Sequence, residues 1–259
     1  MNKFKLKELV DCKKCIVMDL DGTVFLGEQP IQPSVDFINK YKDTKQFFFI
    51  TNNTSHTPDE YVEKLHGFGL NIKVNQIISP LLQAVSIIKE NKFESVFLLA
   101  NTKITKFFKK SLSTTNFTTD FKNADALVVT YDNELTYEKM KNAAFVLQNY
   151  PVRYIVTHRD KVCPTEKGMI PDVGSFVEML FTATNRYPEL ILGKPDTGMI
   201  VPFLADYSKE EILVIGDRLY TDKKLADNME VDFLLVLTGE TKKTEIKNLS
   251  DEIYSIKNL

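Results

Sequence analysis

Short, uninterrupted apolar runs recur along this chain, and each is followed by a polar loop and a helical pattern. The runs occupy residues 16–18, 47–50, 190–192, 212–215 and 233–237. Continuous apolar runs, as opposed to alternating ones, are typical of parallel strands that helices cover on both faces. The repetition therefore predicts an α/β fold built on a doubly wound parallel sheet.

Helix signals lie between these runs. Thr57, Pro58 and Glu60 have the order of an N-cap, a first-turn proline and a capping-box glutamate. Gly67 and Gly69 would end that helix. Weaker helical patterns cover residues 34–41, 197–206 and 222–229. Strands and helices therefore alternate, as the α/β interpretation requires.

The same alternation continues through residues 79–187, but there the strands are not followed directly by acidic residues. The predicted helices are 81–90, 102–112, 137–149 and 174–183, and the predicted strands are 96–99, 127–129 and 154–156. A chain of 259 residues is long enough for a core domain and a second, smaller one. We interpret residues 79–187 as an inserted α/β domain, and residues 1–78 with 188–259 as the core domain.

Charge and hydropathy argue against several classes of protein. With 33 basic and 35 acidic residues, the net charge is -2, and nothing global indicates nucleic acid or membrane lipid. No apolar run approaches membrane-spanning length, and the N-terminus lacks the apolar segment of a signal peptide. We expect a cytoplasmic protein with no nucleic-acid or membrane partner. The sequence leaves open whether it forms a homo-oligomer.

Cys12 and Cys15 form a C-x-x-C pair that could indicate a redox or zinc site. The third cysteine, Cys163, provides no second pair with zinc spacing. Because Cys15 directly precedes the apolar run 16–18, we interpret the pair as reduced, structural cysteines at the entrance of a strand.

Polar residues with useful chemistry follow four of the apolar runs. They are Asp19, Thr51, Lys194 and Asp217, the last after Gly216. In open α/β sheets, ligands bind beyond the carboxyl ends of the strands, near the point where the strand order reverses. One such residue alone is weak evidence, but four at equivalent places predict a shared site.

Asp19 and Asp21 are two carboxylates that leave the first run together. A carboxylate beside a metal stays ionised and can attack phosphorus, while its neighbour can hold a proton for the leaving group. Gly22 allows the sharp turn that would bring both into one pocket. The alternatives are a surface turn and an EF-hand loop. The latter would need Asp or Asn in place of Thr23, and the apolar run before Asp19 argues against both.

Thr51 begins a loop of hydroxyls and amides, residues 51–55, whose N–H groups and hydroxyls could hold phosphate oxygens. Ordinary turn chemistry is the alternative. Lys194 supplies a fixed cation that could neutralise a transferring phosphoryl group, although a lone lysine is usually a surface charge. Pro195 stands where a Walker A loop would need Ser or Thr, so that motif is excluded.

Asp217 and Asp222 follow another buried run. Together with Asp19, Asp217 offers the hard oxygen ligands that Mg²⁺ prefers. Asp222 could orient Lys194 or a bound water. It could also simply cap the following helix, and the two roles are compatible.

Taken in order, these segments resemble the four motifs of the haloacid dehalogenase superfamily. They read DLDGT from Asp19, ITNNTS around Thr51, LGKPD around Lys194 and GDRLYTD from Gly216. The likeness spans nearly the whole chain. With the trailing LLVLTGET, it is closest to the NagD-like and 4-nitrophenylphosphatase-like branch, in which a large C2-type cap is inserted between the second and third motifs.

The resemblance implies Asp19 as nucleophile, with Asp21 as general acid and base. It implies that Thr51, Asn52 and Lys194 bind the phosphoryl group. The implied ligands of Mg²⁺ are the Asp19 carboxylate, the Asp21 backbone carbonyl and Asp217, with Asp222 in support.

In the cap, Thr157, His158, Arg159 and Asp160 stand where relatives often have Thr-Asn-x-Asp. This segment resembles the family's substrate-facing loop, so we predict that His158 and Asp160 influence substrate choice. Histidine in place of asparagine changes the hydrogen bonding and can add charge near pH 6.5.

The resemblance implies an Mg²⁺-dependent phosphatase that hydrolyses small phosphate monoesters through an aspartyl-phosphate. A small phosphorylated metabolite such as a sugar phosphate or nucleotide would be the substrate, with 4-nitrophenyl phosphate as an artificial one. A phosphomutase or phosphotransferase using the same aspartyl-phosphate is one alternative. A non-catalytic binding protein on the same fold is another.

Overall fold

The chain separates into two compact units in the computed structural model, which describes residues 3–118, 121–165, 167–246, 254–256 and 259. The first unit comprises Met1–Thr51, Pro58–Ile78 and Lys194–Leu259, and the second comprises Asn52–Thr57 and Ser79–Gly193. Both are α/β structures around a parallel sheet, which confirms the predicted fold class.

The sheet of the first unit is entirely parallel and has the strand order β15-β14-β13-β1-β4-β5. Its strands are β1 (Cys15–Asp19), β4 (Gln46–Ile50), β5 (Ile77–Ile78), β13 (Ile212–Gly216), β14 (Asp232–Val236) and β15 (Tyr254–Ile256). From β1 the chain proceeds to β4 on one side and returns through β13 on the other. The order therefore reverses between β1 and β13, where ligands of such sheets bind.

Helices cover both faces of this sheet. One face packs against α1 (Lys3–Asp11), α2 (Gln32–Tyr41) and α3 (Pro58–Gly67). The other packs against α8 (Val201–Leu204) and α9 (Lys224–Met229). Smaller elements complete the unit: β2 (Phe25–Leu26), β3 (Gln29–Pro30), η1 (Val74–Gln76), η3 (Lys209–Glu211), the π-helical turn η4 (Leu219–Lys223) and α10 (Lys243–Ile246).

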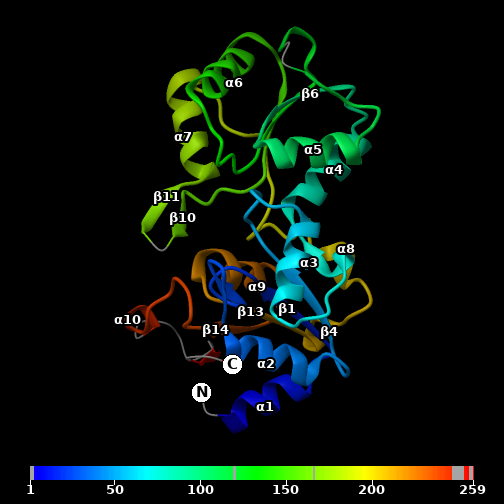
Figure 1. Cartoon of the computed structure of the whole chain (residues 1–259), viewed down its shortest axis with the longest axis vertical. Coiled ribbons are helices and arrows are strands. Elements are labelled where there is room, and N and C mark those ends of the chain that lie inside the picture. The colour runs from blue at the N-terminus through cyan, green and yellow to red at the C-terminus, as the bar shows by residue number, and fades with distance from the viewer. Residues whose placement is uncertain (1–2, 119–120, 166, 247–253, 257–258) are drawn as a thin grey trace. The chain divides into compact units, whose positions relative to one another are not determined.

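The second unit has its own parallel sheet, of order β12-β9-β8-β6-β7. These strands are β6 (Ser95–Leu99), β7 (Asn116–Phe117), β8 (Ala126–Val129), β9 (Arg153–Val156) and β12 (Leu190–Ile191). On one face lie α6 (Tyr137–Asn149) and α7 (Val173–Thr184), side by side in Figure 1. On the other lie α4 (Pro80–Glu90) and α5 (Thr102–Ser111). The turn η2 (Phe121–Asn123) precedes β8.

An antiparallel hairpin, β10 (Val162–Thr165) and β11 (Gly168–Pro171), precedes α7. The sequence reasoning missed this hairpin, and it also missed α1. All four residues of β11 are exposed, so the apolar patterning that reveals the other strands is absent there.

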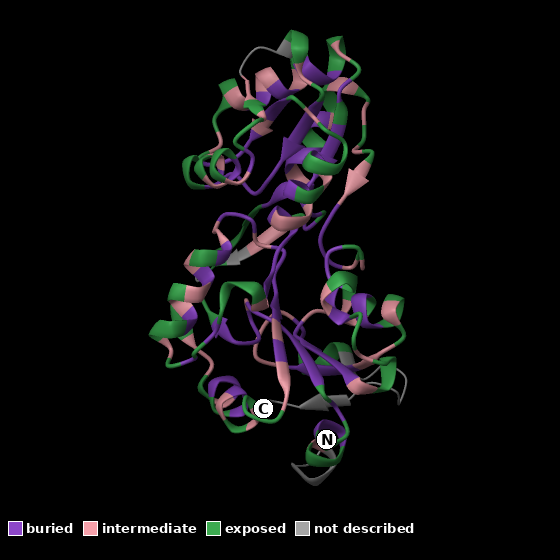
Figure 2. Ribbon diagram, turned by 90° about the vertical axis from the view of Figure 1, so that its right-hand side faces the viewer, coloured by how far each residue is buried: buried purple, intermediate pink, exposed green. Residues whose placement is uncertain are grey.

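Burial follows the same layers. In Figure 2 the sheet strands of each unit are largely purple, whereas the outward faces of the helices are green. Every residue of β1, β8 and β13 is buried, as expected of strands covered on both faces, whereas both residues of β12 are only half-buried.

Three predicted elements differ from the observed ones. The helix expected over 197–206 is only Val201–Leu204, because Pro202 has no N–H to continue a helix begun earlier. The helix expected over 222–229 begins as the π-helical turn and becomes α-helical only at Lys224. Leu190–Ile191 pairs with β9 in the second unit instead of entering the first sheet.

The C-x-x-C pair is not a disulfide, since Cys12 and Cys15 are both free. Cys15 is buried at the start of β1, and burial raises the pKa of its thiol to about 12. Cys12 is exposed, and its thiol donates to the Leu9 carbonyl (3.1 Å). No helix among the described residues has both the length and the apolar character needed to cross a membrane.

Candidate active site

Asp19 and Lys194 form the centre of a buried charged cluster at the carboxyl edge of the first sheet. Asp19 is the last residue of β1, and Lys194 opens the segment that returns to this unit. The Lys194 ammonium donates to Asp19 Oδ1 and also to Asp222 Oδ1 (2.6 Å). Both side chains of the Lys194–Asp222 pair are almost fully buried. Lys194 therefore joins two carboxylates that lie 203 positions apart in the sequence.

Asp222 lies in the π-helical turn that follows β13. Its second oxygen, Oδ2, accepts a hydrogen bond from the backbone N–H of Arg218 (3.1 Å). Gly216 packs directly against it, and a Cβ on Gly216 would lie 2.4 Å from the Asp222 Cβ. Asp222 is thereby fixed, and it contacts Lys194, one of the two partners proposed for it from the sequence.

Asp217 is the third buried carboxylate, directly after β13. Its Oδ2 accepts a hydrogen bond from the backbone N–H of Glu240 (2.6 Å). Its buried Oδ1 has no hydrogen-bond partner among the described residues. A buried carboxylate oxygen without a donor is costly, unless a cation or water serves it.

Two glycines make room for Asp217. A Cβ on Gly239 would lie 1.9 Å from Asp217 Oδ2, and one on Gly22 would lie 2.6 Å from the same atom. Gly22 also has a positive φ of 88°, which side-chain-bearing residues rarely adopt. The Thr238 hydroxyl donates to the Gly22 carbonyl (2.6 Å), tying the loop after β14 to the turn after β1.

The electrostatics of the cluster are unbalanced. Burial raises the pKa of Asp19 well above its ordinary value, an effect that Lys194 opposes and the other two carboxylates reinforce. Burial and Asp222 raise the pKa of Asp217 to about 6. Burial alone would lower the pKa of Lys194, but Asp19 and Asp222 outweigh it and raise that pKa. The Lys194 ammonium thus contacts two of the three carboxylates, and the Arg218 guanidinium is a second cation that lowers the pKa of Asp217.

This arrangement fits a divalent cation. One oxygen from each of Asp19, Asp217 and Asp222 lies within 4.8 Å of the others. Carboxylate oxygens are the ligands Mg²⁺ prefers, and Mg²⁺ is usually held by only one or two of them with water and substrate completing its shell. The undonated Asp217 Oδ1 is the specific atom that such an ion would serve.

Asp21 and Thr51 lie at the same edge of the sheet. Asp21 is half-buried in the turn after β1, which the Gly22 N–H closes on the Phe25 carbonyl (2.7 Å). Thr51 is buried directly after β4, and its N–H donates to the Ile78 carbonyl (3.1 Å). Their chemical roles remain predictions from the sequence.

The other predicted residues lie in the second unit. The Asn52 amide donates to Asp160 Oδ2 (3.2 Å), and both residues are buried. His158 is fully buried, with Nδ1 3.2 Å from Thr157 Oγ1 and Nε2 3.0 Å from Asp172 Oδ1. In this structure His158 presents no surface to a bound molecule, so an influence on substrate choice would have to be indirect.

Sequence reasoning missed the part played by the loop after β14. Gly239 and Glu240 hold Asp217, while the Arg218 guanidinium and the Tyr220 hydroxyl contact the Glu240 carboxylate at 3.0 and 3.1 Å. The available signal was position, because the TGET segment follows a buried run just as Asp19 and Asp217 do.

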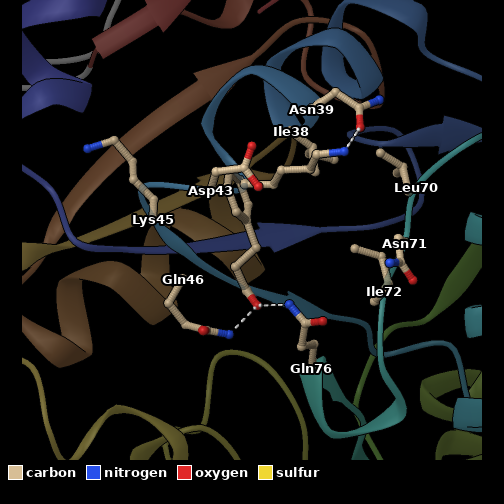
Figure 3. A pocket seen from close by; sticks show the side chains of 11 residues that line it. Ile38, Asn39, Asp43, Lys45, Gln46, Leu70, Asn71, Ile72 and Gln76 are labelled. Carbon is tan, nitrogen blue, oxygen red and sulfur yellow. Dashed lines mark hydrogen bonds between the residues drawn. The ribbon is translucent and has the colours of Figure 1, made fainter.

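A separate pocket of about 320 Å³ lies at the opposite edge of the first sheet (Figure 3). It adjoins Gln46, at the amino end of β4, whereas Thr51 follows the carboxyl end about 16 Å away. The amides of Gln46 and Gln76 both donate to the Phe47 carbonyl, at 3.1 and 2.9 Å. Its lining includes none of the predicted site residues that follow the strands.

Two family models match this chain, and the first match extends from the first unit into the second. The haloacid dehalogenase-like hydrolase model matches residues 16–111, and a HAD-hydrolase-like model matches residues 191–257. The 5'-nucleotidase YutF of Bacillus subtilis is 31% identical over 234 residues, covering 89% of each chain.

Two solved structures are similar over nearly the whole chain. A 4-nitrophenylphosphatase from Thermotoga maritima has a TM-score of 0.86 and 32% identity, covering 96% of both chains. A glycerol phosphate phosphatase from Mycobacterium tuberculosis, in complex with magnesium, has a TM-score of 0.83 and 25% identity. That match covers 95% of this chain and 74% of the other.

Proposed function

This chain belongs to the haloacid dehalogenase-like hydrolases, in their NagD-like and 4-nitrophenylphosphatase-like branch, and we propose that it hydrolyses small phosphate monoesters through an aspartyl-phosphate on Asp19. Its relatives are phosphatases, and so is this protein. The observation that carries the proposal is the buried cluster of three carboxylates around Lys194, at the point where the strand order reverses.

In the first step a carboxylate oxygen of Asp19 attacks phosphorus. A bond forms between that oxygen and phosphorus while the bond from phosphorus to the ester oxygen breaks, and Asp21 donates a proton to the leaving oxygen. Lys194, fixed by Asp222, offsets negative charge on the phosphoryl group. Thr51 and Asn52 supply further donors to its oxygens.

In the second step Asp21 takes a proton from water as the water attacks phosphorus. The bond to Asp19 breaks, inorganic phosphate leaves, and both carboxyl groups return to their starting states. Asp19, Asp217 and the Asp21 carbonyl would hold Mg²⁺. When bound, the ion supplies positive charge that offsets the carboxylates and the phosphoryl oxygens.

We assign substrate choice to the second unit, residues 79–187 in the sequence-based division. The relatives named above act on a nucleotide, on 4-nitrophenyl phosphate and on glycerol phosphate. A small phosphorylated metabolite is therefore the class of substrate proposed here.

The test is hydrolysis of nucleoside monophosphates, sugar phosphates, glycerol phosphate and 4-nitrophenyl phosphate, measured with Mg²⁺ and again with excess EDTA. Asp19→Asn keeps the shape of the side chain but removes the nucleophile, so turnover should be lost. Asp11→Asn, which changes an exposed aspartate paired with Lys7, is the matched control and should be fully active. Asp19→Asn protein that turns over substrate at the wild-type rate would refute the proposal.

A further inference from the structure

A buried chain of hydrogen bonds runs through the second unit. The backbone N–H of Tyr131 donates to Thr54 Oγ1 (2.9 Å), and Thr54 Oγ1 lies 3.1 Å from Thr157 Oγ1. Thr157 Oγ1 lies 3.2 Å from His158 Nδ1, and His158 Nε2 lies 3.0 Å from Asp172 Oδ1. All five residues are buried, and the proposed chemistry uses none of them.

All the hydrogen bonds in this series can point the same way, from the Tyr131 N–H toward the Asp172 carboxylate. An N–H such as that of Tyr131 can only donate, and the Asp172 carboxylate can only accept, as it also does from the Val173 N–H (2.7 Å). His158 Nε2 therefore donates to Asp172, which leaves Nδ1 of a neutral imidazole as an acceptor. Thr157 then donates to His158 and accepts from Thr54. Each group between the two ends donates once and accepts once along the chain.

This series of hydrogen bonds joins four segments of the sequence, beginning with Tyr131, which follows β8. Thr54 belongs to segment 52–57, Thr157 and His158 follow β9, and Asp172 caps the first turn of α7. Two further bonds hold segment 52–57 in this unit: Asn52 donates to Asp160, and the Asn101 amide donates to the Ser55 carbonyl (3.1 Å). Asn52, the residue after Thr51, is thus placed by the second unit.

We propose that His158 is a positioning residue, which fixes segment 52–57 through Thr157 and Thr54 and fixes the start of α7 through Asp172. Because His158 is fully buried, it acts on the reaction only through the placement of Asn52 and the helix. The part of this proposal that concerns Asn52 rests on the proposed function, in which Asn52 contacts the phosphoryl group.

Thr157→Val tests the chain at its centre, because it removes the hydroxyl while keeping the shape of the side chain. Thr130→Val is the matched control. Thr130 follows β8 as Thr157 follows β9, both residues are fully buried, and the Thr130 hydroxyl donates to the Leu99 carbonyl (3.3 Å), outside the chain.

We expect Thr157→Val to lower kcat/KM about tenfold, because a displaced Asn52 would lose one hydrogen bond to the phosphoryl group. The loss should fall mostly on kcat, because a misplaced contact to the reacting group costs transition-state stabilisation. Thr130→Val should stay within about twofold of wild type. The double variant Thr157→Val with His158→Leu should lose little beyond the worse single variant, since the chain is already cut. If the double variant instead lost kcat/KM by the product of the two single losses, the two residues would act independently, which would contradict the proposal.

Amide hydrogen exchange gives a readout that does not depend on activity. Thr157→Val should speed exchange at Tyr131 and across residues 52–57, whereas Thr130→Val should leave both unchanged. Equal exchange in the two variants would overturn the proposal. If wild-type protein hydrolysed no phosphate ester, the proposed function would fail. The exchange comparison would still decide whether these hydrogen bonds hold residues 52–57 in place.

Discussion

The two units end their parallel strands in chemically different ways. In the first unit, the Lys194 ammonium contacts the buried carboxylates of Asp19 and Asp222, while the third, Asp217, has no donor at Oδ1 among the described residues. In the second unit, the buried Asp132 has its own cation, the Lys139 ammonium at 2.6 Å, and its other oxygen accepts the Glu134 N–H (2.9 Å). Asp217 therefore has a carboxylate oxygen that no donor among the described residues serves, whereas both oxygens of Asp132 have partners.

The difference shows that the fold alone does not create the site. Both sheets are parallel, helix-covered and buried, so hydrophobic packing cannot distinguish them. Like charges gathered in a buried place lower the free energy of unfolding. Such a cluster fits a site whose charges are neutralised only when a cation and a phosphate bind. Each prediction below tests that contrast.

The largest effect should come from Lys194→Met. Without the ammonium, Asp19 and Asp222 face each other with no protein cation between them, so turnover should fall by about a thousandfold or more. Steady-state kinetics with a saturating phosphate ester measures this. Lys13→Met is the control, since Lys13 is equally buried but binds Asp232 and the Glu210 carbonyl elsewhere in the unit. Lys13→Met should lower the stability of the protein but leave kcat within a few-fold of wild type. Comparable losses of kcat in both variants would show that Lys194 has no special role in turnover.

A smaller effect is expected from Gly239→Ala. Its Cβ would lie 1.9 Å from Asp217 Oδ2, so the carboxylate must shift, and the affinity for Mg²⁺ should fall about tenfold or more. Calorimetric titration with Mg²⁺ measures this directly. Gly67→Ala has no heavy atom within 4 Å of the new Cβ and should bind Mg²⁺ like wild type. Unchanged affinity in Gly239→Ala would mean that the loop after β14 does not shape the site.

The metal-free protein should lose stability as pH rises from about 4 to 6. The folded-state pKa of Asp217 is raised, from 3.8 to about 6, mainly by burial. Over that interval the folded state binds more protons than the unfolded state, so the free energy of unfolding falls by about 2–3 kcal/mol. Urea denaturation in EDTA should reveal this slope, and Asp217→Asn should make it shallower, leaving the contribution of Asp19, whose pKa is also raised. A wild-type slope retained in Asp217→Asn would assign the effect to other groups.

The smallest effect concerns the cysteines, at the other end of β1. Because burial raises the pKa of Cys15 to about 12, this thiol should resist alkylation in the native protein at pH 8. The exposed Cys12 should react readily. Mass spectrometry of peptides after brief treatment with iodoacetamide distinguishes the two. Fast modification of Cys15 would show that the start of β1 opens easily.

Much of this architecture was predictable because it depends on local pattern. The runs that became β1, β4, β13 and β14 are apolar throughout, and the acids that follow two of them converge because parallel strands share an edge. The order of Asp19, Thr51, Lys194 and Asp217 also carried the family resemblance, which the comparisons confirm.

The rest depended on contacts that no local pattern encodes. Leu190–Ile191 has the apolar character of a core strand, yet its pairing with β9 puts it in the second unit. His158 looked like a substrate-facing residue, but its full burial and its contact with Asp172 emerge only when the second unit folds. Glu240 acts through its backbone N–H, which has no signature in the side-chain sequence.

The most direct test compares Asp217→Asn with Asp132→Asn, one buried carboxylate from each sheet edge, by urea denaturation at pH 7.5 with EDTA and then with Mg²⁺. Without metal, Asp217→Asn should raise the free energy of unfolding by about 1–3 kcal/mol, because it removes an undercompensated charge. Asp132→Asn should lower it by about 1 kcal/mol, because it weakens a satisfied pair. Mg²⁺ should stabilise wild type and Asp132→Asn but not Asp217→Asn. Destabilisation of the metal-free protein by Asp217→Asn, with its Mg²⁺ response intact, would contradict the account.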